Sequence, residues 1–137
     1  MKLNKKSFLV IASIIVGIVI LFLVYDVVNQ SPKEVVTNIM EDIQENKKVE
    51  EISKEDQEKL QSFFEYSQEK NLEKPNLIIS DYPGRPDIVK VTFEIIHNNK
   101  KTGLEAIYEG QADFYLKKQG LHWEVEGIQV TPYRKEW

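Results

Sequence analysis

The sequence contains no cysteine, and this absence excludes several classes of protein at once. Disulfides, a lipoprotein anchor and thiolate metal sites all need that side chain, so the sequence excludes all three. Acidic residues are also missing from the first 25 positions, since all 22 Asp and Glu residues lie from Asp26 onward. We therefore expect a domain that is stabilised by its hydrophobic core alone, preceded by a segment whose charge is purely basic.

A catalytic or cofactor-binding signature is likewise missing. His97 either lies at the inward rim of the predicted sheet or ends a strand beside a turn, and His122 is predicted to face solvent. We find no acid on the inward positions, where burial would tune the pKa of a general base. No loop has the spacing of a calcium chelator. We predict no catalytic residue, no metal and no cofactor, and we expect that the protein is not an enzyme.

One long apolar run is present, with no charged residue in the 19 positions from Ser7 to Tyr25. A helix of that length covers roughly 28 Å, close to the thickness of the bilayer hydrocarbon. Fourteen of the residues from Phe8 to Val24 are Leu, Ile, Val or Phe, and no polar positions recur at the helical period. The run is longer than a usual signal-peptide core and no small-x-small cleavage site follows it. We therefore predict a retained transmembrane helix over 7–25.

Charge predicts the orientation of this helix and the kind of partner that suits the chain. Three lysines lie in the predicted cytoplasmic tail 1–6, so the remainder should lie outside the cell membrane, joined to the helix by a tether over 26–30. The chain after residue 25 has 15 basic and 22 acidic residues, a net charge of −7. This balance disfavours nucleic acid and anionic lipid head groups, and it suits a basic partner. We expect a single-pass membrane protein with an extracellular C-terminal domain.

Residues 31–137 form the predicted extracytoplasmic domain, which begins with two helices. Ser31 to Glu34 reads as a capping box with proline at the first helical position. A second helix is predicted to begin at Ser53, whose hydroxyl can cap it, with the acidic Asp56 three residues later. Apolar residues follow each start at helical spacing, and they are Val35, Val36, Ile39, Met40 and Ile43 in the first helix and Leu60, Phe63, Phe64 and Tyr66 in the second.

After Pro75 the apolar period changes from helical to alternating, which predicts strands. A short strand over 77–79 is followed by a turn with Pro83 and Gly84 in its centre, and then by three longer strands. In the last strand the apolar side switches at Glu126-Gly127, as a glycine bulge would produce. We predict an α+β domain in which two helices pack on a curved antiparallel sheet of three to four strands.

The helix pair and the meander, ending in Trp123-Glu124-Val125-Glu126-Gly127-Ile128, resemble the cystatin-like and nuclear transport factor 2-like folds. The resemblance covers about residues 31–131 and lies in element order and strand pattern, not in a sequence signature. Two clear helices, where the second group usually has three, favour the cystatin-like version. Small Gram-positive surface proteins often carry such domains behind one membrane helix. Because both folds host many functions, the resemblance implies shape and little about activity.

The outward face of the predicted sheet combines acids with apolar residues. Like charges on neighbouring strands cost stability, and apolar residues ringed by acids can mark a recognition surface for a basic partner. The alternative is an ordinary solvated face of an acidic protein. The hypothetical partner-binding residues are Glu94, Ile96, Glu105, Ile107, Glu109, Asp113, Tyr115 and Glu124.

The inward face offers an alternative site, because Tyr108, Phe114 and Trp123 share it with Gly110 and Ala112. These residues either line a small apolar pocket or leave room for helix aromatics to pack closely. We expect a non-enzymatic, membrane-anchored domain that binds another exported or membrane protein. Two such roles are an accessory subunit of a secretion or conjugation system and an immunity protein that binds an exported toxin. The alternative function is a small-molecule or lipid-binding sensor, or a degenerate enzyme, that uses the inward cone of the sheet. By this we mean the cone-shaped space between the helices and the inward face of the sheet.

Overall fold

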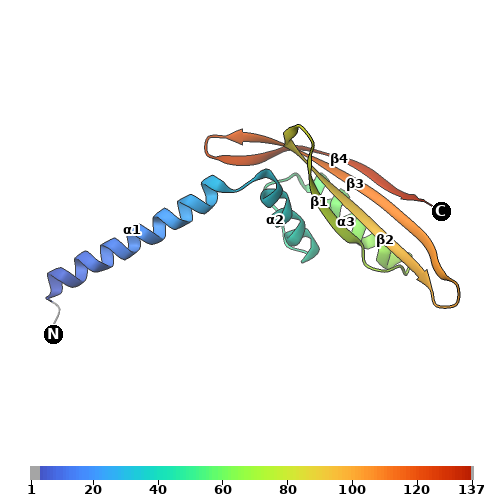
Figure 1. The fold of residues 1–137 in the computed structure, drawn as a ribbon, viewed down its shortest axis with the longest axis horizontal. Coiled ribbons are helices and arrows are strands. Elements are labelled where there is room, and N and C mark those ends of the chain that lie inside the picture. Colours follow the sequence, from blue (N-terminus) through green and yellow to red (C-terminus); the bar gives the residue numbers. More distant parts are fainter. Residues whose placement is uncertain (1–3, 137) are drawn as a thin grey trace.

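The computed structural model describes residues 4–136 and shows one long helix joined to a small α+β domain (Figure 1). The predicted fold class, with helices on a four-stranded antiparallel sheet, is therefore confirmed. Residues 1–3 of the predicted tail 1–6, and the side chains at positions 26–29, lie outside the described part of the chain. The elements are α1 Lys5–Asn29, α2 Pro32–Gln44, α3 Lys54–Glu69, β1 Asn76–Tyr82, β2 Arg85–Asn99, β3 Gly103–Gln119 and β4 His122–Lys135.

Helix α1 is long and apolar enough to cross a membrane over Lys5–Tyr25, by length and composition. It has no polar face, and the side chains of Leu21 and Phe22 are 69% and 67% exposed. The hydroxyl of Ser13 donates a 2.8 Å hydrogen bond to the Leu9 carbonyl, so this polar group is satisfied within the helix. Such a helix suits a lipid environment, where every polar group must be paired internally.

Only two residues lie between the end of α1 and the start of α2, which begins at a capping box. The Glu34 N–H donates to the Ser31 hydroxyl at 3.2 Å, and the Ser31 N–H donates to the Glu34 carboxylate at 3.1 Å. Pro32 occupies the first turn, where its missing N–H costs nothing. The predicted start is confirmed, and so is the predicted stripe, whose buried members are Val36, Ile39, Met40 and Ile43.

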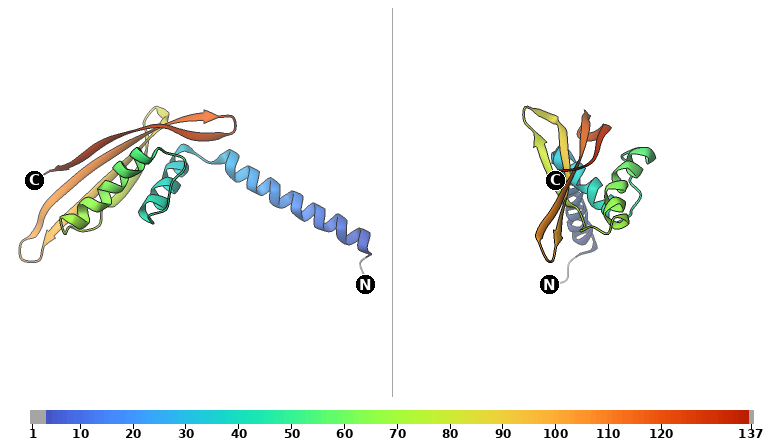
Figure 2. Two further views of the ribbon diagram at one scale, coloured as in Figure 1. Left: turned by 180° about the vertical axis from the view of Figure 1, so that it is seen from behind. Right: turned by 90° about the vertical axis from the view of Figure 1, so that its right-hand side faces the viewer.

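Helix α3 begins at Ser53, whose hydroxyl accepts a 3.1 Å hydrogen bond from the Asp56 N–H, as predicted. Its buried residues Leu60 and Phe63 face the sheet alongside the stripe of α2. Both helices lie on the same side of the sheet (Figure 2). The core between the two layers contains Val89, Val91 and Phe93 from β2 and Ala112, Phe114 and Leu116 from β3.

The sheet is an antiparallel meander in the order β1-β2-β3-β4. Two-residue turns need unusual backbone angles, and Gly120 supplies a φ of +61° at the first position of the turn between β3 and β4. In β4 the register shifts, because Gly127 pairs with Tyr115 whereas Val125 pairs with Leu116. Glu126 is therefore an extra residue, which confirms the predicted bulge. The bulge brings both Val125 and Ile128 to the helix side of the sheet.

Gly110 has no side chain and therefore leaves a notch, a small gap on the inward face of β3, which determines how closely α3 approaches the sheet. The Phe63 ring stacks on Phe93 with centroids 4.0 Å apart and planes at 8°, and it contacts Tyr133 edge-on at 5.1 Å. A Cβ atom added to Gly110 would overlap the Phe63 ring. The small residues on β3 therefore make room for a helix aromatic, as one of the two interpretations of this face expected.

We predict that Gly110→Ala destabilises the domain by about 1–3 kcal/mol, because the added methyl overpacks the Phe63 contact. Urea unfolding of the full chain in detergent micelles, followed by circular dichroism, measures the change. Gly127→Ala is the matched control, since nothing lies within 4 Å of a Cβ added there. Equal unfolding midpoints for the two variants would contradict the prediction.

Candidate functional site

The face of the sheet opposite the helices is uncovered by any element in residues 4–136 (Figure 2). The register between β2 and β3 places Glu94 directly opposite Glu109, and Ile96 directly opposite Ile107. We call these four residues the outer patch. Ile96 is 37% exposed, and the remaining three are half-buried or exposed. The sequence-based hypothesis named all four, and the structure brings them into two adjacent cross-strand pairs.

The carboxylates of the outer patch are arranged unfavourably for folding. Like charges directly opposite on an antiparallel pair repel, whereas opposite charges attract by roughly 0.2–1 kcal/mol. On its other side Glu109 lies opposite Arg134 of β4, which offsets part of this repulsion. Glu94 lies opposite Asn76 of β1 and gains no such neighbour. The patch therefore combines a like-charge pair with two apolar side chains on an open surface.

Three other residues of the predicted acidic face lie among compensating groups. Asp113 is opposite Lys90 and accepts a 2.8 Å hydrogen bond from the Gln111 side chain. The Tyr115 hydroxyl donates to Gln129 at 3.2 Å. Glu124 is opposite Lys117 and lies 2.9 Å from the ring of His122, which is exposed as predicted. The predicted face is thus not one continuous acidic surface, because the strand register interleaves its acids with cations.

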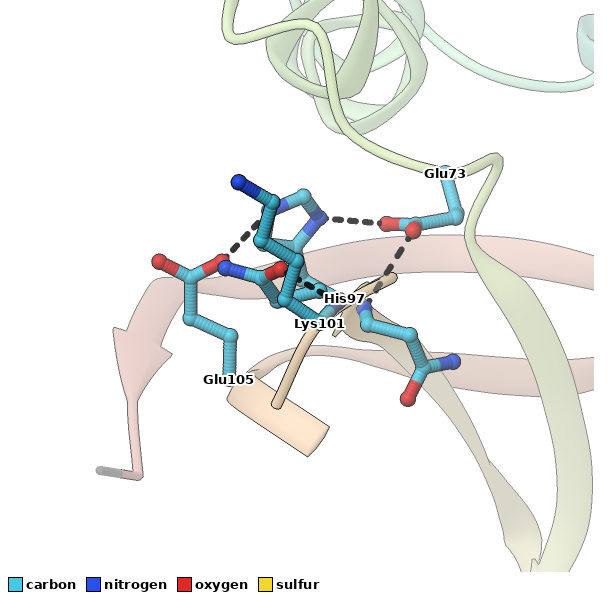
Figure 3. Close-up of polar contacts among 6 residues, drawn as sticks. Glu73, His97, Lys101 and Glu105 are labelled. Atoms are coloured by element: carbon cyan, nitrogen blue, oxygen red, sulfur yellow. Dashed lines mark hydrogen bonds and ion pairs between the residues drawn. The ribbon is translucent and has the colours of Figure 1, made fainter. Parts of the chain in front are cut away.

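Glu105, the remaining predicted partner-binding residue, points to a histidine at the end of the sheet (Figure 3). The register shifts between His97, which pairs with Ala106, and Asn98, which pairs with Leu104. Glu105 is therefore an unpaired bulge residue, and its carboxylate lies 3.3 Å from His97 Nε2. Sequence parity placed Glu105 on the outer face, but it could not locate this bulge.

His97 also contacts the loop that precedes β1, through a residue that the sequence did not single out. Glu73 lies 2.8 Å from His97 Nδ1, and its second oxygen accepts a 3.3 Å hydrogen bond from the Asn98 N–H (Figure 3). Strand β1 begins at Asn76, opposite Glu94, so β2 beyond this point has no β1 neighbour. Glu73 thus occupies an edge N–H that would otherwise be free for another strand. No local pattern marks it, since 24 residues separate it from His97.

A groove between α3 and β4 is a further feature that the sequence did not predict. Its volume is about 590 Å³, and its lining includes Tyr66, Val130 and Tyr133 together with Glu65 and Glu69. The rings of Tyr66 and Tyr133 lie 4.8 Å apart. The Tyr133 hydroxyl donates to the Phe63 carbonyl at 3.1 Å, and burial raises the pKa of Tyr133.

The structure does not bring Tyr108, Phe114 and Trp123 into one pocket. Phe114 is fully buried in the core, and the ring of Tyr108 lies 6.0 Å from that of Tyr66. Trp123 pairs with Lys118 near the far end of β3. Tyr108, Phe114 and Lys118 are six and four residues apart along β3, which separates them by roughly 20 and 13 Å. Helix side chains fill the inward face between them.

Residues 4–136 contain no group of three or more His, Cys, Asp or Glu side chains that is arranged to hold a metal ion. Comparison of the chain with protein-family models, with curated proteins and with solved structures finds no match.

We call His97, Glu73 and Glu105 the His97 cluster, and we expect its contacts to weaken as the solution becomes acidic. The hydrogen bond with His97 is the main cause that lowers the pKa of Glu73, and a backbone hydrogen bond from Asn98 contributes. A carboxyl whose pKa is lower in the folded state stabilises fully above the unfolded pKa of about 4.3, and this stabilisation is lost as the pH falls through the folded value. We predict that Glu73→Gln is less stable than the unsubstituted chain at neutral pH, and that the difference shrinks below about pH 4.

Urea midpoints measured as a function of pH test this prediction, with Glu50→Gln as the control at an exposed position in the loop between α2 and α3. A deficit in Glu73→Gln that stays constant into the acid range would show that the carboxylate charge is unimportant.

Proposed function

We propose that the protein is a non-enzymatic, single-pass membrane protein whose C-terminal domain lies outside the cytoplasm and binds another protein through the outer patch. The observation that carries the proposal is the pair Glu94 and Glu109, directly opposite each other and beside Ile96 and Ile107. Folding alone disfavours this pair. A basic side chain from a partner would lie between the two carboxylates, while the isoleucines supply apolar contact area.

Membrane anchorage is supported by α1, and orientation by the charges that flank it. Lys5 and Lys6 precede the apolar span, and all acidic residues follow it. Basic residues favour the cytoplasmic side, so the domain lies on the other side of the membrane. Only Gln30 and Ser31 separate α1 from α2, and the three Cα–Cα steps between the two helices span at most about 11 Å. The domain therefore lies close to the bilayer surface, where exported or membrane-bound proteins are its accessible partners.

The acidic patch and the proximity to the membrane suit two specific roles. The first is an accessory subunit of a secretion or conjugation system, which would hold a basic surface of a neighbouring membrane component. The second is an immunity protein that binds a basic exported toxin before it reaches the membrane. Two helices on a curved meander give the domain a cystatin-like shape, and the anchor suits the surface of a Gram-positive cell. Both assignments are part of the proposal.

A second candidate function, a small-molecule sensor, is favoured by the groove between α3 and β4. Tyr66 and Tyr133 present aromatic rings there, with Glu65 and Glu69 nearby. Aromatic faces and carboxylates together suit an apolar ligand that carries a cationic group. The core fills the inward cone of the sheet, so this groove is the place for such a ligand.

The main proposal predicts that Glu94→Lys weakens partner binding. A photo-crosslinking amino acid at Ile96, introduced into the full chain in its native cells, should give a defined adduct that decreases in the Glu94→Lys background and with rising salt. Glu50→Lys makes the same charge change away from the sheet and should leave the adduct intact. An adduct that is insensitive to Glu94→Lys would refute the patch as the binding surface.

The same substitution should not damage the fold. Because Glu94→Lys replaces a like-charge pair by an attractive one, we predict that it raises the free energy of unfolding by about 0.2–1 kcal/mol. Glu109→Lys should stabilise less, because Arg134 lies opposite position 109 on β4. Urea unfolding of both variants measures the asymmetry. A loss of stability in Glu94→Lys would mean that the carboxylate serves folding and not a partner.

A further inference from the structure

The turn between β3 and β4 exposes a large apolar side chain at its tip. Gly120 and Leu121 form the turn between the pair Gln119 and His122, and the Leu121 side chain is 62% exposed. The turn between β2 and β3, at the opposite end of the sheet, consists of Lys100, Lys101 and Thr102. Of these two turns, the one between β3 and β4 therefore has the apolar tip.

This hairpin tip lies beside the membrane end of the molecule. Figure 1 shows the β3–β4 hairpin extending past the other strands toward the C-terminal end of α1, and the view from behind in Figure 2 shows the same placement. Cα atoms of β4 lie within 8 Å of Cα atoms of α1. The apolar span of α1 ends at Tyr25, about one helical turn before the end of the helix, which is roughly 6 Å of rise. A membrane that holds α1 therefore has its surface close to the tip.

The side chains around Leu121 match the chemistry of a bilayer interface. Lys117 and Lys118 precede the turn, and Trp123 follows it, half-buried. The Lys118 ammonium lies 6.0 Å from the Trp123 ring. Tryptophan is enriched at membrane interfaces, and lysines near a membrane surface are attracted to anionic head groups. Glu124 lies opposite Lys117, so Lys118 is the less compensated cation of the tip.

We infer that the β3–β4 tip is a second membrane contact, in which Leu121 enters the interface and the adjacent lysines face lipid phosphates. The net charge of −7 outside the helix argued against anionic head groups, but charges more than a Debye length of about 10 Å away are largely screened. The local charge at the tip therefore decides this contact. Two attachment points would fix the tilt of the domain against the membrane. The inference rests on the proposed anchorage by α1, and it is independent of the outer patch.

The absence of cysteine makes the inference directly testable. Leu121→Cys and the control Thr102→Cys, in the turn at the other end of the sheet, are each labelled with an environment-sensitive fluorophore in the full chain. The labelled chains are reconstituted into vesicles of phosphatidylcholine, with or without an equimolar share of phosphatidylglycerol. Flotation with the vesicles establishes anchorage, and quenching by a water-soluble and a lipid-soluble quencher establishes where each label lies.

We expect emission at position 121 to shift to shorter wavelength than at position 102, with greater quenching by the lipid-soluble agent. Phosphatidylglycerol should enlarge the difference, and Lys118→Glu should reduce it. A label at position 121 that is as accessible to the aqueous quencher as the label at position 102, in a chain that floats, would overturn the tip contact alone. A label shielded from both quenchers would mean that protein covers the tip, and it would also overturn the inference. A chain that fails to float would overturn the anchorage and the tip contact together.

Discussion

The close packing of α3 on the sheet through Phe63 and Gly110 is the contact on which the rest of the domain depends. A cysteine-free domain of this size has no crosslink to replace a lost core contact, and full burial of one aromatic side chain contributes about 1.5–3 kcal/mol. Phe63 stacks on Phe93 from β2, occupies the notch of β3 and contacts Tyr133 of β4. One helix residue therefore connects three strands. Because it fixes which face of the sheet is buried, it also fixes which face is left open.

The open face of the sheet is a consequence of that packing, whereas the position of the domain beside α1 has other causes. With the inward positions occupied by core residues, every second residue of β2 and β3 is presented outward, and the outer patch forms where two such rows meet. The short connection between α1 and α2 then keeps the domain beside the end of the apolar helix. The length of β3 carries the β3–β4 hairpin past the helices toward α1 (Figure 1). Proximity to α1 and exposure of the sheet thus arise from separate parts of the chain.

The charges of the domain divide into those that stabilise the fold and those that do not. Glu73 and Glu105 both contact His97, and Glu73 also covers an edge N–H of β2. Asp113 and Glu124 lie opposite lysines on neighbouring strands. Glu94, by contrast, lies opposite Glu109 on one side and Asn76 on the other, whereas Glu109 also has Arg134 opposite it on β4. Glu94 is therefore the carboxylate that fold stability does not explain, and the proposed binding of a partner rests on it.

Sequence patterns alone determined the apolar span, both helix starts, the buried stripes, the strand order and the bulge at Glu126, because each depends on residues that are close along the chain. Hydrophobic period and capping are local properties, so the composition of a short segment specifies them. Only the tertiary structure decided that Glu105 lies beside His97, that Tyr108, Phe114 and Trp123 lie apart, and that the β3–β4 hairpin extends toward α1. These features depend on register shifts and on contacts between distant segments. A single unpaired residue reverses the face of all that follow, and at Glu105 no switch in apolar parity marks it, as one does at Glu126.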